Sequence, residues 1–83
     1  MKLEAPSPYT QMRSIMDPVR NALDQFAAIK GSDPRQAAKH WAEYVDGMRL
    51  LVSLALDIRL SSKQREVIWK YVEFWRHEGE NRC

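Results

Sequence analysis

The chain has little cysteine, little glycine and no long apolar run. Its single cysteine, Cys83, excludes a disulfide framework and a cysteine-based zinc finger, because both need several thiols. No apolar segment approaches the roughly 18 residues of a membrane-spanning helix, and the first residues lack the apolar region of a signal peptide. The three glycines are isolated, so no glycine-rich phosphate loop is present. We therefore expect a soluble cytoplasmic protein that does not enter a membrane.

Charge is nearly balanced along the chain. It carries 13 Lys and Arg against 11 Asp and Glu, and this net charge of +2 is lower than that of a domain held on phosphate by charge alone. Hydrophobic residues make up 45% and charged residues 29%, which is the balance of a globular domain. A single core in a chain of 83 residues barely offsets the entropy cost of ordering, and self-association is a common remedy. We therefore expect a homodimer.

The first predicted helix spans residues 17–30. Asp17-Pro18 combines a preferred N-cap residue with the preferred first helical residue. Apolar residues then recur every three or four positions, which is the spacing of one helix face: Val19, Ala22, Leu23, Phe26 and Ile29. Residues 1–8 contain two prolines and are expected to form a flexible lead-in. A short extra helix over residues 9–16 is the alternative for the segment between them.

The second predicted helix spans residues 34–60. Asp33-Pro34 repeats the cap-and-proline signal, and an apolar stripe follows at helical spacing: Ala38, Trp41, Val45, Met48, Val52 and Ala55. Strict alternation over 50–60 also fits a strand, but this run is rich in leucine and has no second strand to pair with. An Asp-Gly dipeptide ending at Gly47 would fit a break in the helix. We favour an unbroken helix in which the glycine lets a neighbouring helix or a Trp ring come close.

The third predicted helix spans residues 62–78 and begins with a capping box. Ser61 and the glutamine three residues later have the spacing at which each side chain bonds the other's backbone N–H. Gly79 offers a stop after a wide apolar face that consists of Val67, Ile68, Tyr71, Val72, Phe74 and Trp75. The connections between these helices are short. We therefore predict an all-α fold, a three-helix bundle in one domain over 9–79, with a flexible tail over 80–83.

The sequence offers no credible set of catalytic residues. His40 with Glu43, and Glu73 with His77, each share a helix face and supply residue types that bind metals. A di-iron site needs more inward carboxylates than these, and the second pair lies on the polar side of its helix. Both pairs are typical of solvated surface residues. We therefore expect no catalytic residue, no metal and no cofactor, in a protein that is not an enzyme.

Residues 60–67 read Leu-Ser-Ser-Lys-Gln-Arg-Glu-Val. This run resembles the opening of the helix-turn-helix region in sigma factors and LuxR-type regulators, where a similar run starts the scaffold helix. The resemblance implies a nucleic-acid-binding transcriptional regulator with an incomplete helix-turn-helix-like element at 60–78, since no recognition helix follows before Cys83. Basic and acidic residues alternate along this segment, which is typical of a solvated helix face. Nucleic-acid binding is therefore the alternative hypothesis.

The last helix holds more aromatic residues than one neighbour can cover. Trp69, Tyr71, Phe74 and Trp75 lie within seven residues, and at 100° per residue they cannot all face one helix. Trp69 lies on an otherwise polar flank, and Trp, Tyr and Arg dominate interface hot spots. The predicted interface with a partner or a second copy consists of Trp69, Arg65, Val72, Arg76, Tyr71, Phe74, Leu54 and Ile58. The leading hypothesis is a small non-enzymatic interaction module that regulates, inhibits or escorts a larger partner protein.

Overall fold

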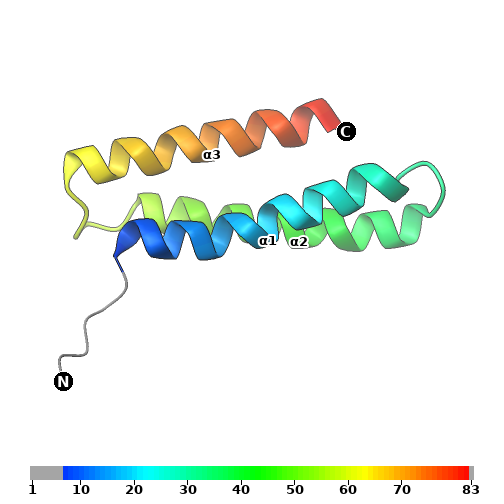
Figure 1. Ribbon diagram of the computed structural model, residues 1–83, viewed down its shortest axis with the longest axis horizontal. Coiled ribbons are helices and arrows are strands. Elements are labelled where there is room, and N and C mark those ends of the chain that lie inside the picture. Colours follow the sequence, from blue (N-terminus) through cyan, green and yellow to red (C-terminus); the bar gives the residue numbers. More distant parts are fainter. Residues whose placement is uncertain (1–6, 83) are drawn as a thin grey trace, which may run out of the picture.

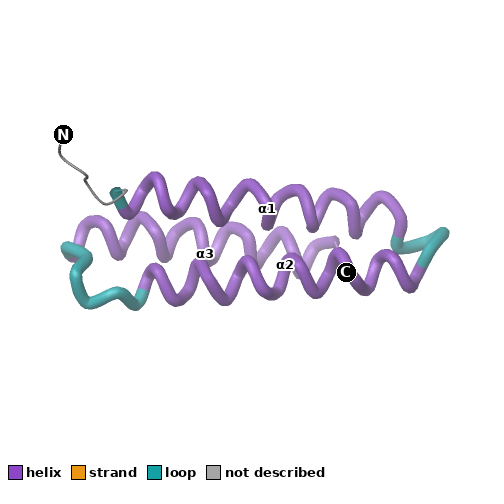
Figure 2. Tube along the Cα trace, turned by 90° about the horizontal axis from the view of Figure 1, so that it is seen from below, coloured by secondary structure: helices purple, strands orange, loops and turns teal. Residues whose placement is uncertain are grey.

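The structure is an up-down-up bundle of three helices. A computed structural model of the chain describes residues 7–82, and its elements are α1 (Pro8–Ile29), α2 (Pro34–Ala55) and α3 (Ser62–Arg82). All three follow one long axis, with α1 parallel to α3 and α2 antiparallel to both (Figure 1). Seen from below, α3 lies behind the space between α1 and α2 (Figure 2). Every pair of helices is in contact, so the predicted all-α three-helix bundle is confirmed.

α1 is one continuous helix, which corrects the prediction of a helix over 17–30 and a separate segment over 9–16. The helix begins at a signal that sequence reasoning assigned to the lead-in. The Ser7 hydroxyl accepts a hydrogen bond from the backbone N–H of Thr10 at 3.2 Å, and proline occupies the first turn. The remainder of the expected lead-in, residues 1–6, lies outside the described residues.

Pro18 lies inside α1 and does not start a helix. An internal proline removes one hydrogen bond of the helix and usually kinks or breaks it. Here Met12 is buried before the proline, and Val19 and Leu23 are buried after it. Because both halves pack on the same core, tertiary contacts hold the helix together across the proline.

α2 begins where the sequence predicted and ends at Ala55, short of the predicted end at residue 60. The Asp33 carboxylate accepts from the backbone N–H of Gln36 at 3.2 Å, which confirms the N-cap. Beyond the helix, the Asp57 carboxylate accepts from the backbone N–H of Arg59 at 2.9 Å. This local bond gives the backbone an alternative to the helical ladder, so the helix gives way to a turn. The described part of this segment contains no strand.

α3 confirms the predicted capping box but not the predicted stop. The backbone N–H of Ser61 donates to Gln64 Oε1 at 2.9 Å, and the backbone N–H of Gln64 donates to Ser61 Oγ at 3.2 Å. The helix then continues through Gly79 to Arg82, so the described residues of the expected tail form its last turn. Gly79 is buried against the Tyr44 ring, where a Cβ would collide with the phenol. Its role is therefore close packing and not helix termination. Cys83 lies outside the described residues.

The core lies between the three helices, and all of them contribute buried side chains to it. Its fully buried large side chains are Leu23, Leu51, Ile68 and Val19. Gly47 lets the two helices approach, because a Cβ at this position would collide with Val19 Cγ2. The predicted role of this glycine in an unbroken helix is thereby confirmed. Among the described residues, no helix combines the length and apolarity needed to cross a bilayer.

Candidate functional site

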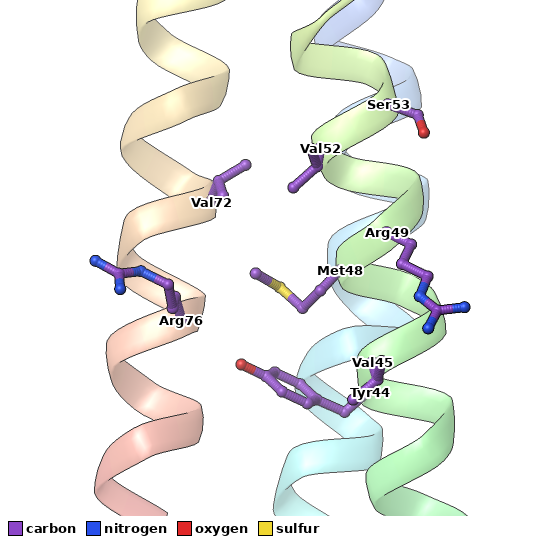
Figure 3. A pocket seen from close by; sticks show the side chains of 8 residues that line it. All are labelled: Tyr44, Val45, Met48, Arg49, Val52, Ser53, Val72 and Arg76. Carbon is purple, nitrogen blue, oxygen red and sulfur yellow. The ribbon is translucent and has the colours of Figure 1, made fainter.

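An open apolar groove separates α2 from α3. It has a volume of about 600 Å³, and it is lined by Tyr44, Val45, Met48, Arg49, Val52, Ser53, Val72 and Arg76. Figure 3 shows Val52 and Met48 extending from α2 toward α3, and Val72 extending from α3 toward α2. Val45, Met48 and Val52 are only partly buried, although all three pack against the core. The groove is therefore apolar surface that α2 and α3 do not fully cover.

Tyr44 ties the two helices together beside the groove. Its ring is buried, and its hydroxyl donates to the Trp75 carbonyl oxygen at 2.7 Å. The hydroxyl fits into the space that Gly79 leaves free on α3. Figure 3 shows the ring directed from α2 toward α3. This contact sets the spacing between the two helices at the groove.

Two arginines flank the groove, and their surroundings differ. Arg76 donates to Glu73 Oε2 at 2.5 Å and lies 3.5 Å from Glu80 Oε1. The hydrogen bond that Arg76 donates to Glu73 raises the pKa of Arg76, so this guanidinium stays charged and is neutralised by its own helix. Arg49 is exposed on the outer side of α2 and forms no ion pair within residues 7–82. The groove therefore carries one unneutralised positive charge.

The structure gives two of the predicted interface residues roles within the fold. Trp69 is partly buried and packs against the core, so its ring lies over the edge of the bundle. Arg65 Nε donates to the Ala55 carbonyl at 3.1 Å, and Arg65 Nη2 donates to the Asp57 carbonyl at 2.8 Å. The first bond satisfies a carbonyl group at the C-terminal end of α2, which a helix leaves without an intrahelical partner, and the second holds the turn that follows.

Two other predicted interface residues are core residues. Leu54 is 8% exposed and Val72 is 4% exposed, so neither offers much surface to a partner. Leu54 belongs to the core because the wide apolar face of α2 is covered by its neighbours at this position. Val72 keeps a smaller role, since it lines the floor of the groove.

The exposed members of the predicted set do not form one surface. Phe74 is 49% exposed and Tyr71 is 39% exposed, and helical spacing turns both away from the Arg76 side of α3. Ile58 is 92% exposed in the connection between α2 and α3. The eight predicted residues are therefore divided among the core, the groove, the opposite flank and a turn.

The charged pair in this turn organises the backbone. Arg59 donates to both carboxylate oxygens of Asp57, with distances of 2.7–3.2 Å. Hydrogen bonds from the Arg59 side chain and backbone lower the pKa of Asp57 to about 2. Its carboxylate is therefore ionised and engaged with the turn.

Sequence reasoning placed the α2 side of the groove in the core stripe and missed its exposure. Val45, Met48 and Val52 share helical spacing with buried residues, and spacing alone does not show that α3 leaves them half covered. Arg49 was missed altogether. A signal was available, because it interrupts an otherwise uncharged flank of the predicted helix.

The histidine and carboxylate pairs remain separate. His40 Nδ1 lies 3.5 Å from Glu43, and His77 Nδ1 lies 3.7 Å from Glu80. Within the described part of the chain, no three His, Cys, Asp or Glu residues come close enough together to hold a metal ion. A second hollow of about 440 Å³ lies near the turn between α1 and α2. Beside it, the ring centroids of Trp41 and Phe26 are 5.0 Å apart.

No protein-family model, curated protein or solved structure matches the chain.

Proposed function

We propose that this chain is a small non-enzymatic interaction protein that regulates, inhibits or escorts a larger partner protein. The apolar groove between α2 and α3 carries the proposal. Half-covered Val45, Met48 and Val52 offer apolar surface whose burial by a partner is favourable. Grooves between helices commonly accept an amphipathic helix of another protein.

The charges on α3 are less suited to nucleic acid. Arg76 is paired with carboxylates of its own helix, and Arg82 is paired with Asp24 and Glu78. Phosphate binding is stronger when Lys and Arg gather on one face without neighbouring carboxylates. These pairs support protein binding over the nucleic-acid alternative.

Site-specific photo-crosslinking in the cells that produce the protein tests the proposal. A photoreactive residue replaces Val45 in the groove, and the matched control replaces Leu50, which is 59% exposed on α2 outside the groove. We expect a discrete covalent adduct with another protein from position 45 and none of that mass from position 50. Equal adducts from both positions, or none from position 45, would contradict the proposal.

The homodimer expected from the size of the chain stays a prediction. Tyr71 and Phe74 provide exposed aromatic surface for it on the flank of α3 that faces away from the groove. Light scattering at micromolar concentration should give about twice the chain mass of 9.7 kDa. A mass near 9.7 kDa across that range would rule the dimer out.

A further inference from the structure

One outer flank of α2 has the repeat of a helix-packing seam. Its residues follow alternating intervals of four and three, which is the spacing of the a and d positions in a heptad: Ala38, Ala42, Val45, Arg49, Val52 and Leu56. We name this set the α2 stripe. Its members are exposed or partly buried, and Leu56 is 61% exposed just beyond the end of the helix. The stripe borders the groove, since three of its members also line it.

The other outer flank of α2 has a different composition. It carries charged residues at helical spacing, namely Lys39, Glu43 and Asp46, with Leu50 as the single large apolar residue among them. Arg35 lies three residues before Ala38 and continues the spacing of the stripe at the start of the helix. That flank is typical of a solvated surface. The α2 stripe contains no carboxylate and one charge, so its composition is that of a surface packed against another helix.

Arg49 lies in the middle of the stripe and specifies the charge of the occupant. It forms no ion pair with any residue of 7–82. A helix packed over the stripe would remove this guanidinium from water, and an arginine buried at an interface needs a carboxylate partner. A second copy packed symmetrically would place another Arg49 in the seam, and its closest carboxylate in the sequence, Asp46, lies on the other outer flank of α2. Charge complementarity therefore favours a different protein as the occupant.

We propose that the α2 stripe and the adjoining groove bind an amphipathic helix of another protein, which carries an Asp or Glu in the middle of its apolar face opposite Arg49. The proposal rests on the proposed interaction function and specifies the partner segment. The stripe spans 19 residues, so the occupant is a helix of ~27 Å. Once bound, it completes a four-helix arrangement with α1, α2 and α3.

Two designed peptides test the charge requirement. Each is a hydrocarbon-stapled helix of about 20 residues with leucines at heptad spacing, and the two differ only in a Glu or a Lys at the central seam position. Binding to the full chain is measured by fluorescence anisotropy. We expect the Glu peptide to bind about tenfold or more tightly than the Lys peptide, since close charge pairs at interfaces couple at least this strongly.

Substitutions in the protein locate the binding site and separate the explanations. The variant Arg49→Glu should reverse the preference between the peptides, and Val45→Lys should weaken both. The matched control Leu50→Lys, on the charged flank of the same helix, should change neither affinity. Equal binding of the two peptides, or a preference that survives Arg49→Glu, would overturn the proposal.

Two further outcomes also decide the question. Loss of self-association in Val45→Lys, measured by light scattering, would make a second copy the occupant and overturn the proposal. If position 45 crosslinks to another protein but the Glu and Lys peptides bind equally, the proposed interaction function is supported. The proposed partner helix with an Asp or Glu opposite Arg49 is then wrong. Failure of the partner assignment is thus distinguishable from failure of the proposed function.

Discussion

The two sides of α2 meet their neighbouring helices in different ways. Toward α1, Gly47 removes a side chain so that Val19 can lie against the helix backbone, and Leu23 and Leu51 are fully buried in this seam. Toward α3, the close approach is made by Tyr44 against Gly79, and an open groove lies beside it. We call these the closed seam and the open seam.

The difference separates stability from binding. Side chains in the closed seam are already removed from water, so the free energy gained from their burial stabilises the fold. Val45 and Val52 in the open seam are half covered and gain burial only when something else binds. Substitutions should therefore divide into those that unfold the protein and those that change its surface.

The largest expected effect is in the closed seam. Leu51→Ala should destabilise the fold by ~2–5 kcal/mol, because it removes buried methyl groups and leaves a cavity. The neighbouring Leu50→Ala is the matched control, since Leu50 is 59% exposed and Leu51 is 0% exposed. It should change the free energy of unfolding by less than ~0.5 kcal/mol. Urea denaturation measures both, and equal losses would contradict the placement of the seam.

A smaller effect is expected from a side chain added at the helix crossing. Gly47→Ala should destabilise the fold by ~1–3 kcal/mol despite the better helix propensity of alanine, because its Cβ forces Val19 or the backbone to move. Gly31→Ala is the control, since nothing lies within 4 Å of a Cβ there. Thermal unfolding compares the two. A stabilised Gly47→Ala variant would show that the seam is looser than described.

The hydrogen bond between Tyr44 and the Trp75 carbonyl in the open seam should contribute less to the free energy of unfolding than the closed-seam contacts. Tyr44→Phe removes the hydroxyl that donates to the Trp75 carbonyl and should cost ~0.5–1.5 kcal/mol. Amide hydrogen exchange should speed up more in α3 than in α1, since this bond attaches α3 to the other helices. Uniform acceleration across all three helices would contradict that attachment.

The smallest expected effect is a pH dependence in the turn after α2. The pKa of Asp57 is lowered from its ordinary value of 3.8 to about 2. The ionised carboxylate therefore stabilises the fold fully at pH values above about 4. This contribution is lost as the pH falls from about 4 through about 2. Asp57→Asn should therefore be less stable than the original at neutral pH, and the difference should shrink as the pH falls through about 2. A carboxyl titration by NMR with an ordinary midpoint for Asp57 would contradict the assignment.

Local signals predicted the helix starts better than the helix ends. The caps at Asp33 and Ser61 depend on side chains within three residues, and both were predictable from the sequence. The stop expected at Gly79 was wrong because that glycine accommodates a tyrosine from a distant part of the chain. The same limitation applied at Pro18, where packing outweighs a proline that locally indicates a helix start.

The candidate site was harder to predict for a related reason. Helical spacing showed which residues share a face, but it did not show how far apart α2 and α3 lie. Leu54 and Ile58 were both expected at an interface, yet one is buried and the other is almost fully exposed. Exposure of Val45 and Val52 depends on the spacing that Tyr44 sets, which requires the tertiary structure.

The division between the two seams is tested most directly by melting Val45→Lys with and without the stapled Glu peptide. A ligand that binds only the folded protein raises its Tm, and the rise follows the affinity. We expect the variant without peptide to melt within a few degrees of the original protein, because a half-exposed lysine extends its charge into water. We also expect the peptide to raise the Tm of the original protein but not that of the variant. An equal rise in both, or a variant that is unfolded before peptide is added, would contradict the account.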